Sequence, residues 1–431
     1  MKRFNIFRHI FAFVITAAVC IVLLLLSAGI PNSAIQKNML SSAEYLNSKF
    51  VYYDLNEGII ASRIDHYADS ILLNIANAYD SDDTLHSVMW SSYYFTTTQN
   101  ENANLYDAVT QDLEPNQQYL RYWHGSITFV KPLLMFLSIE KIYILNAVIM
   151  AILAIWLIAE LIRRKGYVPV AGMVFGLVSV AVWYVPLSLE YTWMFLLTFP
   201  AGIVALYLSD KNKREWYGVF FIVVGVITNF LDFLTIETLP CFIPLLLILW
   251  QEGKSDTGKS FKDTAKFAAK NIICFLIGYA GMWILKWVLA SVILNINALD
   301  YVTEHISERL DGSYVGLENV TRAQIMIGSL TRNILTLLPN GFGLVGVLIS
   351  VCILFWVIYT CFVYAKKSFD KNLVLIYLII AILPYVRYLI LHNHSFIHYF
   401  FTFRAQLATL FAIALIMNEI VDWRLHFGKK R

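Results

Sequence analysis

Two carboxylates in the first quarter of the chain have a spacing that could support chemistry. Asp65 and Asp69 lie four residues apart within 59–79, where apolar residues recur with helical periodicity. This pattern predicts an amphipathic helix lying on the membrane surface, with both carboxylates on one face. The pair could take a proton from a hydroxyl or hold a cation that bridges to phosphate. The alternative is a solvated helix face.

Cationic side chains in two regions of the sequence suit phosphate binding. Arg121 and His124 end an aromatic, polar segment, and Lys131 follows. A guanidinium matches phosphate oxygens, although such side chains also extend to lipid headgroups. A second group lies near the outer ends of the last two apolar segments, where ionisable residues indicate function. It comprises Arg387, His392, His394, His398 and Arg404. We expect a cationic pocket for a lipid phosphate there, in preference to zinc ligation by His394 and His398.

Three acidic residues and one lysine lie near other apolar segments. Glu190, Asp232 and Glu237 fall in connections that we expect on the outer surface, where they could hold sugar hydroxyls or simply end loops. Lys286 lies in the outer half of a predicted span, where it could pair with an acidic residue or a phosphate.

The composition sets the class of protein that must position these residues. Of 431 residues, 58% are apolar and 15% charged, and the mean hydropathy is +0.62. Soluble domains carry about 25% charged residues, so a soluble enzyme and a disordered scaffold are excluded. A net charge of +3 gives no reason to expect nucleic acid as a partner. The five cysteines all lie in apolar runs without a Cys-x-x-Cys pair, which indicates small buried hydrophobes.

We therefore predict an all-α polytopic membrane protein with about ten transmembrane helices. A bilayer core needs about 20 apolar residues per helix. The runs that meet or approach this length are 7–30, 142–162, 168–187, 191–209, 216–233, 235–250, 271–294, 342–365, 372–391 and 398–420. Two shorter stretches, 127–138 and 333–340, are interpreted as interfacial or re-entrant pieces.

Charge distribution predicts the orientation and the domain layout. Most of the 33 basic residues fall at one set of segment ends, which places both termini in the cytoplasm of a multi-pass plasma-membrane protein. Residues 1–30 form the first transmembrane helix, with a cleaved signal peptide as the alternative. Residues 31–141 form a large extracytoplasmic loop with amphipathic interfacial helices, and 142–431 form a transmembrane domain of about nine helices.

Together these features resemble the GT-C superfamily, the integral-membrane glycosyltransferases that use polyprenyl-phosphate sugars. The resemblance is to an uncharacterised bacterial branch. It is carried by Asp65-His66-Tyr67-Ala68-Asp69, Arg121-Tyr122-Trp123-His124-Gly125, and Asn393-His394-Ser395 with His398 and Phe401-Thr402-Phe403-Arg404. The chain has an Asp-x-x-x-Asp spacing where several GT-C branches have two adjacent acidic residues.

The resemblance implies an inverting transfer of a sugar from a lipid-linked donor to a glycan or lipid acceptor at the outer face of the bilayer. Asp65 would be the base, and Asp69 would orient it or hold a divalent cation such as Mg or Mn. Arg121, Arg404 and His124 would neutralise the leaving phosphate. Two alternatives use the same outer pocket: a transporter or flippase of an envelope lipid or glycan, and a polymerase or ligase of a lipid-linked glycan.

Overall fold

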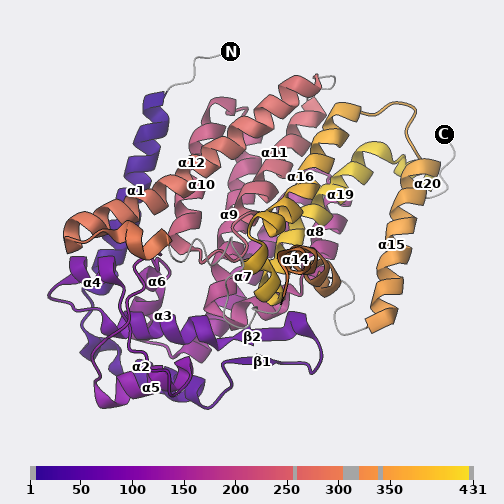
Figure 1. Ribbon diagram of the computed structural model, residues 1–431. Helices are drawn as coiled ribbons and strands as arrows, with labels where there is room; N and C mark the ends of the chain where they lie inside the picture. The colour runs from indigo at the N-terminus through magenta and orange to yellow at the C-terminus, as the bar shows by residue number, and fades with distance from the viewer. Residues whose placement is uncertain (1–5, 256–259, 304–319, 338–342, 427–431) are drawn as a thin grey trace.

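The prediction of an all-α polytopic membrane protein is confirmed. The computed structural model describes residues 6–255, 260–303, 320–337 and 343–426, and within these ranges eight helical segments are long and apolar enough to cross a bilayer. They run side by side as a tilted bundle (Figure 1). They are α1 (Ile6–Ala28), α7 (Ile139–Arg163), α9 (Leu189–Asp210), η3–α10 (Arg214–Trp216 and Tyr217–Leu231), α12 (Phe261–Leu294), α15 (Gly343–Val363), α16 (Lys371–Ile390) and α18–η4–α19 (Tyr399–Thr402, Phe403–Gln406 and Leu407–Ile420).

Two of the ten predicted spans form shorter helices than their apolar runs. In 168–187, α8 (Tyr167–Ser179) ends near Ala181, whose φ of 51° is incompatible with a continuing helix, and the 3₁₀ turn η2 (Val182–Leu187) follows. In 235–250, α11 (Leu239–Ser255) begins after a turn and has 17 residues. Hydropathy alone extends through such breaks because it does not report backbone conformation.

The predicted outer loop folds into a compact cap at one end of the bundle. The cap, residues 32–134, occupies the lower part of Figure 1, and its strands β1 and β2 pair antiparallel. The far ends of α1 and α19 point away from it. Its elements are α2 (Asn32–Asn47), β1 (Tyr52–Asp54), η1 (Ile60–Ser62), β2 (Arg63–Asp65), α3 (His66–Ala78), α4 (Thr84–Trp90), α5 (Glu101–Gln111) and α6 (Ile127–Leu134).

The predicted amphipathic helix over 59–79 is shorter and differently placed. Residues 63–65 pair with β1 in the register Tyr52↔Asp65, so α3 begins only at His66. Asp65 therefore caps the helix, its Oδ1 accepting a hydrogen bond from the Ala68 amide at 3.0 Å. The prediction that Asp65 and Asp69 share one helix face is wrong, because strand pairing takes Asp65 out of the helix. Most of α3 is buried in the cap, where it does not present a free face to a membrane.

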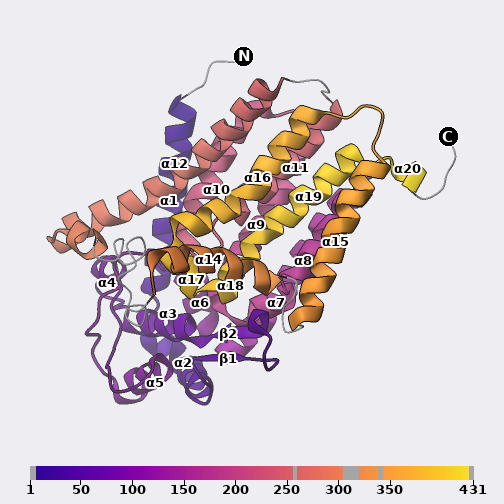
Figure 2. The ribbon, with the colours of Figure 1, turned by 45° about the vertical axis from the view of Figure 1, so that its right-hand side comes forward.

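The two short apolar stretches also have defined places. Residues 127–138 contain α6, which packs against α1 and α2. Residues 333–337 end α14 (Arg322–Leu337), which lies across the bundle in Figure 2, whereas 338–340 lie outside the described residues. Beside α14 lies α17 (His392–Ile397), and α20 (Trp423–His426) ends the described chain.

Helix α15 stands at the side of the bundle in both views (Figures 1 and 2). Only Gly346 and Thr360 are buried along it, as expected for a helix that faces lipid. Its cysteines differ from the predicted buried state: Cys352 is exposed and Cys361 is half-buried. The other three cysteines are buried.

Buried donors on the bundle hold the cap in place by bonding to its backbone carbonyls. Lys286 donates to the carbonyls of Val88 and Met89 at 2.6 and 3.1 Å, which completes the C-terminal end of α4. Arg404 donates to the carbonyl of Ala61 at 2.9 Å. Lys286 thus binds neither an acidic residue nor a phosphate, because its ammonium group is occupied by the cap.

The segment 123–125 makes the reverse connections, from the cap into the bundle. The Trp123 indole donates to the Met282 carbonyl at 2.9 Å, and the Gly125 amide donates to the Phe230 carbonyl at 3.0 Å. A β-carbon at Gly125 would collide with that same carbonyl. A glycine is therefore required for this close approach of backbone to backbone.

We expect Gly125→Ala to destabilise the protein by about 1–3 kcal/mol, because overpacking against backbone cannot be relieved by a rotamer change. The thermal unfolding midpoint of the purified chain should fall by several degrees. Gly29→Ala is the matched control, since a β-carbon there would meet its nearest atom at 3.6 Å. Equal midpoints for the two variants would contradict the packing argument.

Candidate functional site

Six of the fourteen candidate residues named from the sequence line one cavity between the cap and the bundle. This carboxylate cavity has a volume of about 290 Å³. It receives side chains from β1, β2, α3, the 119–124 segment, the start of α9, Phe233 and α17–α18. The lining residues are Tyr52, Asp65, Tyr67, Ala68, Ile71, Leu72, Tyr119, Arg121, Tyr122, His124, Glu190, Phe233, His394, Ile397, His398 and Phe401.

A pair of carboxyl groups forms the acidic part of the cavity. Asp65 is 2% exposed, and its side chain hydrogen-bonds to that of Glu190, in the first turn of α9. Burial raises the pKa of Asp65 to about 6, while the bonds with the Ala68 amide and Glu190 oppose that rise. Two carboxyl groups in hydrogen-bond contact require a proton between them, so they titrate as a pair. Asp65 therefore changes its protonation closer to neutral pH than an exposed aspartate does.

Asp69 lies behind this pair and does not line the cavity. Its Oδ1 accepts a hydrogen bond from the Leu189 amide at 2.8 Å, and its Oδ2 accepts one from the Tyr143 hydroxyl. Burial raises the pKa of Asp69 to about 8, and the hydrogen bond from Tyr143 opposes the rise. Because Leu189 precedes Glu190, Asp69 fixes the start of α9 and thereby places Glu190 beside Asp65. The geometry favours a positioning role over contact with a substrate.

Arg121 supplies positive charge to the same cavity. Its guanidinium lies 3.9 Å from the ring centroid of Tyr119 and 5.4 Å from that of Tyr122. Among the described residues no carboxylate forms an ion pair with it. The prediction that Arg121 is available to an anion is therefore consistent with its surroundings.

The histidines in the cavity differ in what they can bind. The Nε2 of His124 lies 3.0 Å from the Tyr119 carbonyl, so this nitrogen must carry the proton. Burial lowers the pKa of His124 to about 3, which keeps the ring neutral. Its Nδ1 is then an acceptor, suited to a hydroxyl and unsuited to a phosphate oxygen. The rings of His394 and His398 have centroids 4.7 Å apart and reach the lining from α17 and the residue that follows it, beside α14.

Three other predicted site residues are engaged elsewhere. Arg387 and Glu237 form a buried ion pair, with Nε–Oε1 at 2.8 Å, and Arg387 also donates to Ser395 and the Leu234 carbonyl. Asp232 accepts from the Leu234 and Thr235 amides and closes a turn. None of the three lines the carboxylate cavity. The phosphate role predicted for Arg387 and the sugar role predicted for Glu237 and Asp232 find no support in this geometry.

Arg404 is also kept from the cavity by backbone contacts. It is fully buried, donates to the Phe400 and Ala61 carbonyls, and lies 4.8 Å from the Tyr191 ring. Lys131, considered with Arg121 for phosphate, is buried near the Ala28 carbonyl and the Tyr79 ring. His392 lies outside the cavity lining as well. Arg404 and Lys131 thus donate to backbone carbonyls, a use that residue type alone does not reveal.

Aromatic residues make up a part of the lining that the pattern of charged residues does not predict. Tyr52 and Tyr67 stack with centroids 5.9 Å apart and planes at 12°, and Tyr122, Phe233 and Phe401 complete the apolar surface. Exposed aromatic faces suit sugar rings. The density of tyrosine and tryptophan in 119–123 was the available signal, and it also fits a membrane interface.

No group of three or more His, Cys, Asp or Glu side chains within the described ranges is arranged to hold a metal ion. The divalent cation predicted from the sequence, Mg or Mn, therefore has no preformed set of three such ligands among the described residues. Its binding stays a prediction.

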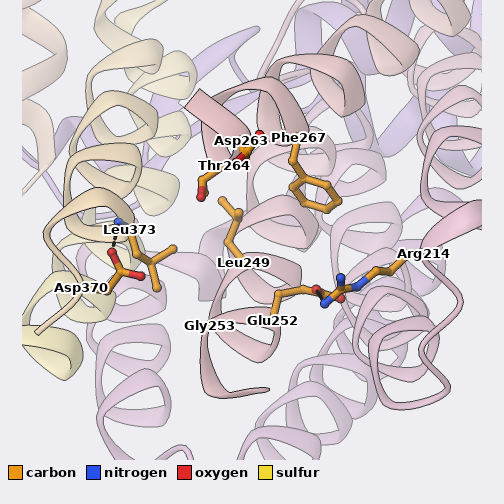
Figure 3. Close-up of a pocket in the computed structure, with 9 residues that line it drawn as sticks. All are labelled: Arg214, Leu249, Glu252, Gly253, Asp263, Thr264, Phe267, Asp370 and Leu373. Carbon is orange, nitrogen blue, oxygen red and sulfur yellow. Dashed lines mark hydrogen bonds and ion pairs between the residues drawn. The ribbon is translucent and has the colours of Figure 1, made fainter. Parts of the chain in front are cut away.

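A different cavity lies at the end of the bundle away from the cap. Figure 3 shows Arg214 and Glu252 side by side as an ion pair, with Asp263 and Phe267 nearby, around a volume of about 190 Å³. Asp370 caps α16 by accepting from the Leu373 amide at 3.0 Å. None of the residues proposed for catalysis or substrate binding lines this cavity.

Comparisons with protein-family models, curated proteins and solved structures found no match to this chain. Its functional proposal rests on the carboxylate cavity and on the resemblance of its motifs.

We expect Glu237→Met and Arg387→Met each to destabilise the protein by about 3–5 kcal/mol, because each leaves a buried charge without its partner. The double variant should be more stable than either single variant, since neither charge of the pair is then left without its partner. Tryptophan fluorescence during heating measures the unfolding midpoint of the two single variants and of the double variant. Independent losses that add in the double variant would contradict a structural ion pair.

Proposed function

We propose that this chain is a membrane glycosyltransferase of the GT-C type. It transfers a sugar from a polyprenyl-phosphate donor to an envelope glycan or lipid acceptor on the outer face of the plasma membrane. The observation that carries this proposal is one cavity that combines Asp65 and Glu190 with Arg121 and three histidines. Carboxylates suit the activation of a hydroxyl, and a guanidinium suits a departing phosphate.

Asp65 is the proposed base. Its carboxylate takes the proton of an acceptor hydroxyl as the hydroxyl oxygen bonds to the anomeric carbon of the donor sugar. The bond between that carbon and the phosphate oxygen breaks in the same step, which inverts the anomeric configuration. A pKa near 6 allows Asp65 to be ionised at neutral pH and still basic enough to accept a proton.

Arg121 is the proposed partner of the leaving group. The polyprenyl phosphate departs as an anion, and a guanidinium without a carboxylate partner in the described structure can compensate the growing charge. His124 accepts a hydrogen bond from a sugar or acceptor hydroxyl through Nδ1, so its role differs from the phosphate role expected from sequence. The aromatic surface of Tyr52, Tyr67 and Phe401 supports a sugar ring.

The substrate side of the proposal is supported by the membrane architecture. Eight helices are long and apolar enough to cross a bilayer, and a lipid-linked donor resides in that same bilayer. The positive-inside distribution favours an extracytoplasmic cap, and hence a reaction at the outer face.

We expect Asp65→Asn to accumulate its donor, because binding is retained while proton transfer is lost. The variant and the wild-type chain should be purified from the membranes of the source cells, and their bound lipids identified by mass spectrometry. A polyprenyl-phosphate monosaccharide should be enriched in Asp65→Asn relative to the wild-type chain. The control Asp82→Asn, which changes an exposed carboxylate of the same cap, should show no such enrichment. Only bulk phospholipid in all samples would contradict the transferase proposal. A lipid-linked oligosaccharide bound equally by every form would favour a flippase.

We also expect sugar transfer to decrease on acidification, since protonated Asp65 cannot act as a base. With a pKa of about 6, the rate at pH 5 should be about one-tenth of its plateau above pH 7. Initial rates of transfer between pH 4.5 and 8 measure this decrease in rate, with Asp82→Asn as the control. A rate that stays constant down to pH 5 would exclude Asp65 as the base.

A further inference from the structure

A second, larger cavity lies within the cap. It is bounded by α2, α3, the segment after α5 and Tyr94, and has a volume of about 490 Å³. We call it the cap cavity. It shares no lining residue with the carboxylate cavity. Neither the sequence patterns nor the proposed mechanism makes use of it.

Amide and hydroxyl groups dominate one wall of the cap cavity. Asn32, Ser33 and Gln36 come from the start of α2, and Asn77 comes from the end of α3. The side-chain amide of Asn77 is half-buried and has no hydrogen-bond partner among the described residues. It offers two donors and an acceptor to whatever enters the cavity.

The charge of the lining selects the class of ligand. Three carboxylates, Asp80, Asp112 and Glu114, line the cap cavity, and no lysine or arginine does. An anionic ligand would be repelled here, whereas carboxylate oxygens accept hydrogen bonds from hydroxyl groups. Tyr94 adds an aromatic side chain to the lining. Amides, carboxylates and an aromatic ring together match an uncharged saccharide.

Helix α3 forms a wall of both cavities. Ala68 and Leu72 line the carboxylate cavity, and Asn74 and Asn77 line the cap cavity. Ile71 of the carboxylate cavity and Asn74 of the cap cavity are three residues apart, so they are neighbours on the helix surface, with β-carbons about 5–6 Å apart. An oligosaccharide can span that separation. The helix that places Asp65 at its N-terminus thus also contributes to the cap cavity at its C-terminal half.

We propose that the cap cavity binds the non-reacting sugars of an uncharged glycan acceptor, whose terminal hydroxyl reaches Asp65. The acceptor role rests on the proposed transferase function, whereas saccharide binding itself does not. The proposal names the acceptor class as a neutral oligosaccharide and assigns it a site separate from the donor.

The test is saturation-transfer NMR on the full chain in lipid nanodiscs, with cellotriose, maltotriose, tri-N-acetylchitotriose and anionic trigalacturonate as probes. We expect at least one neutral trisaccharide to bind. Asn77→Leu and Glu114→Gln should weaken that binding at least fivefold. The matched controls Asn47→Leu and Glu44→Gln change exposed residues of α2 outside the cavity and should leave it unchanged.

Asp65→Asn separates this proposal from the transferase proposal. Retained trisaccharide binding in that variant supports the cap cavity, whatever its lipid analysis shows. Loss of binding in Asp65→Asn with full binding in Asn77→Leu would place the saccharide in the carboxylate cavity and overturn the inference. Absence of neutral trisaccharide binding, or preference for trigalacturonate, would overturn it as well.

Discussion

The arrangement of the site depends on a carboxylate that is buried where the cap meets the bundle. Asp69 accepts hydrogen bonds from the Leu189 amide and the Tyr143 hydroxyl. These bonds join α3 of the cap to α9 and α7. The first amides of a helix have no partner within it, so a buried helix start needs an external acceptor. By providing it, Asp69 fixes Glu190 next to Asp65. The acid pair exists because these helices meet at this point.

The same requirement explains how the protein uses several of its buried cations. A folded cap against an apolar bundle brings backbone carbonyls into places that water does not reach, and each needs a donor. Lys286 and Arg404 supply such donors, at α4 and η1 respectively. Arg387 is held by Glu237. Arg121 differs, because it lies over tyrosine rings at the cavity and has no ion-pair partner in the described structure.

Sequence patterns predicted the fold class well and the local geometry of the site less well. The all-α polytopic architecture follows from long apolar runs, because a bilayer demands continuous apolar helices. Asp65, Arg121, His124, Glu190, His394 and His398 were proposed from residue type, and all six line one cavity. The helical periodicity around Asp65 did not reveal that β1, distant by several residues, would recruit 63–65 into a strand. Such pairing is a non-local interaction that a window of sequence cannot report.

What the sequence determined by itself is the environment and the chemical inventory. Apolar composition requires a membrane, and the types of its polar residues define which acids, bases and cations are available. Tertiary structure alone decided which of them have unused bonding capacity. Asp65 and Glu190 become a proton-sharing pair, and Arg387 becomes the partner of Glu237, through contacts between segments far apart in the chain. The physical reason is that hydrogen bonds and ion pairs act over a few ångströms, and only folding sets those distances.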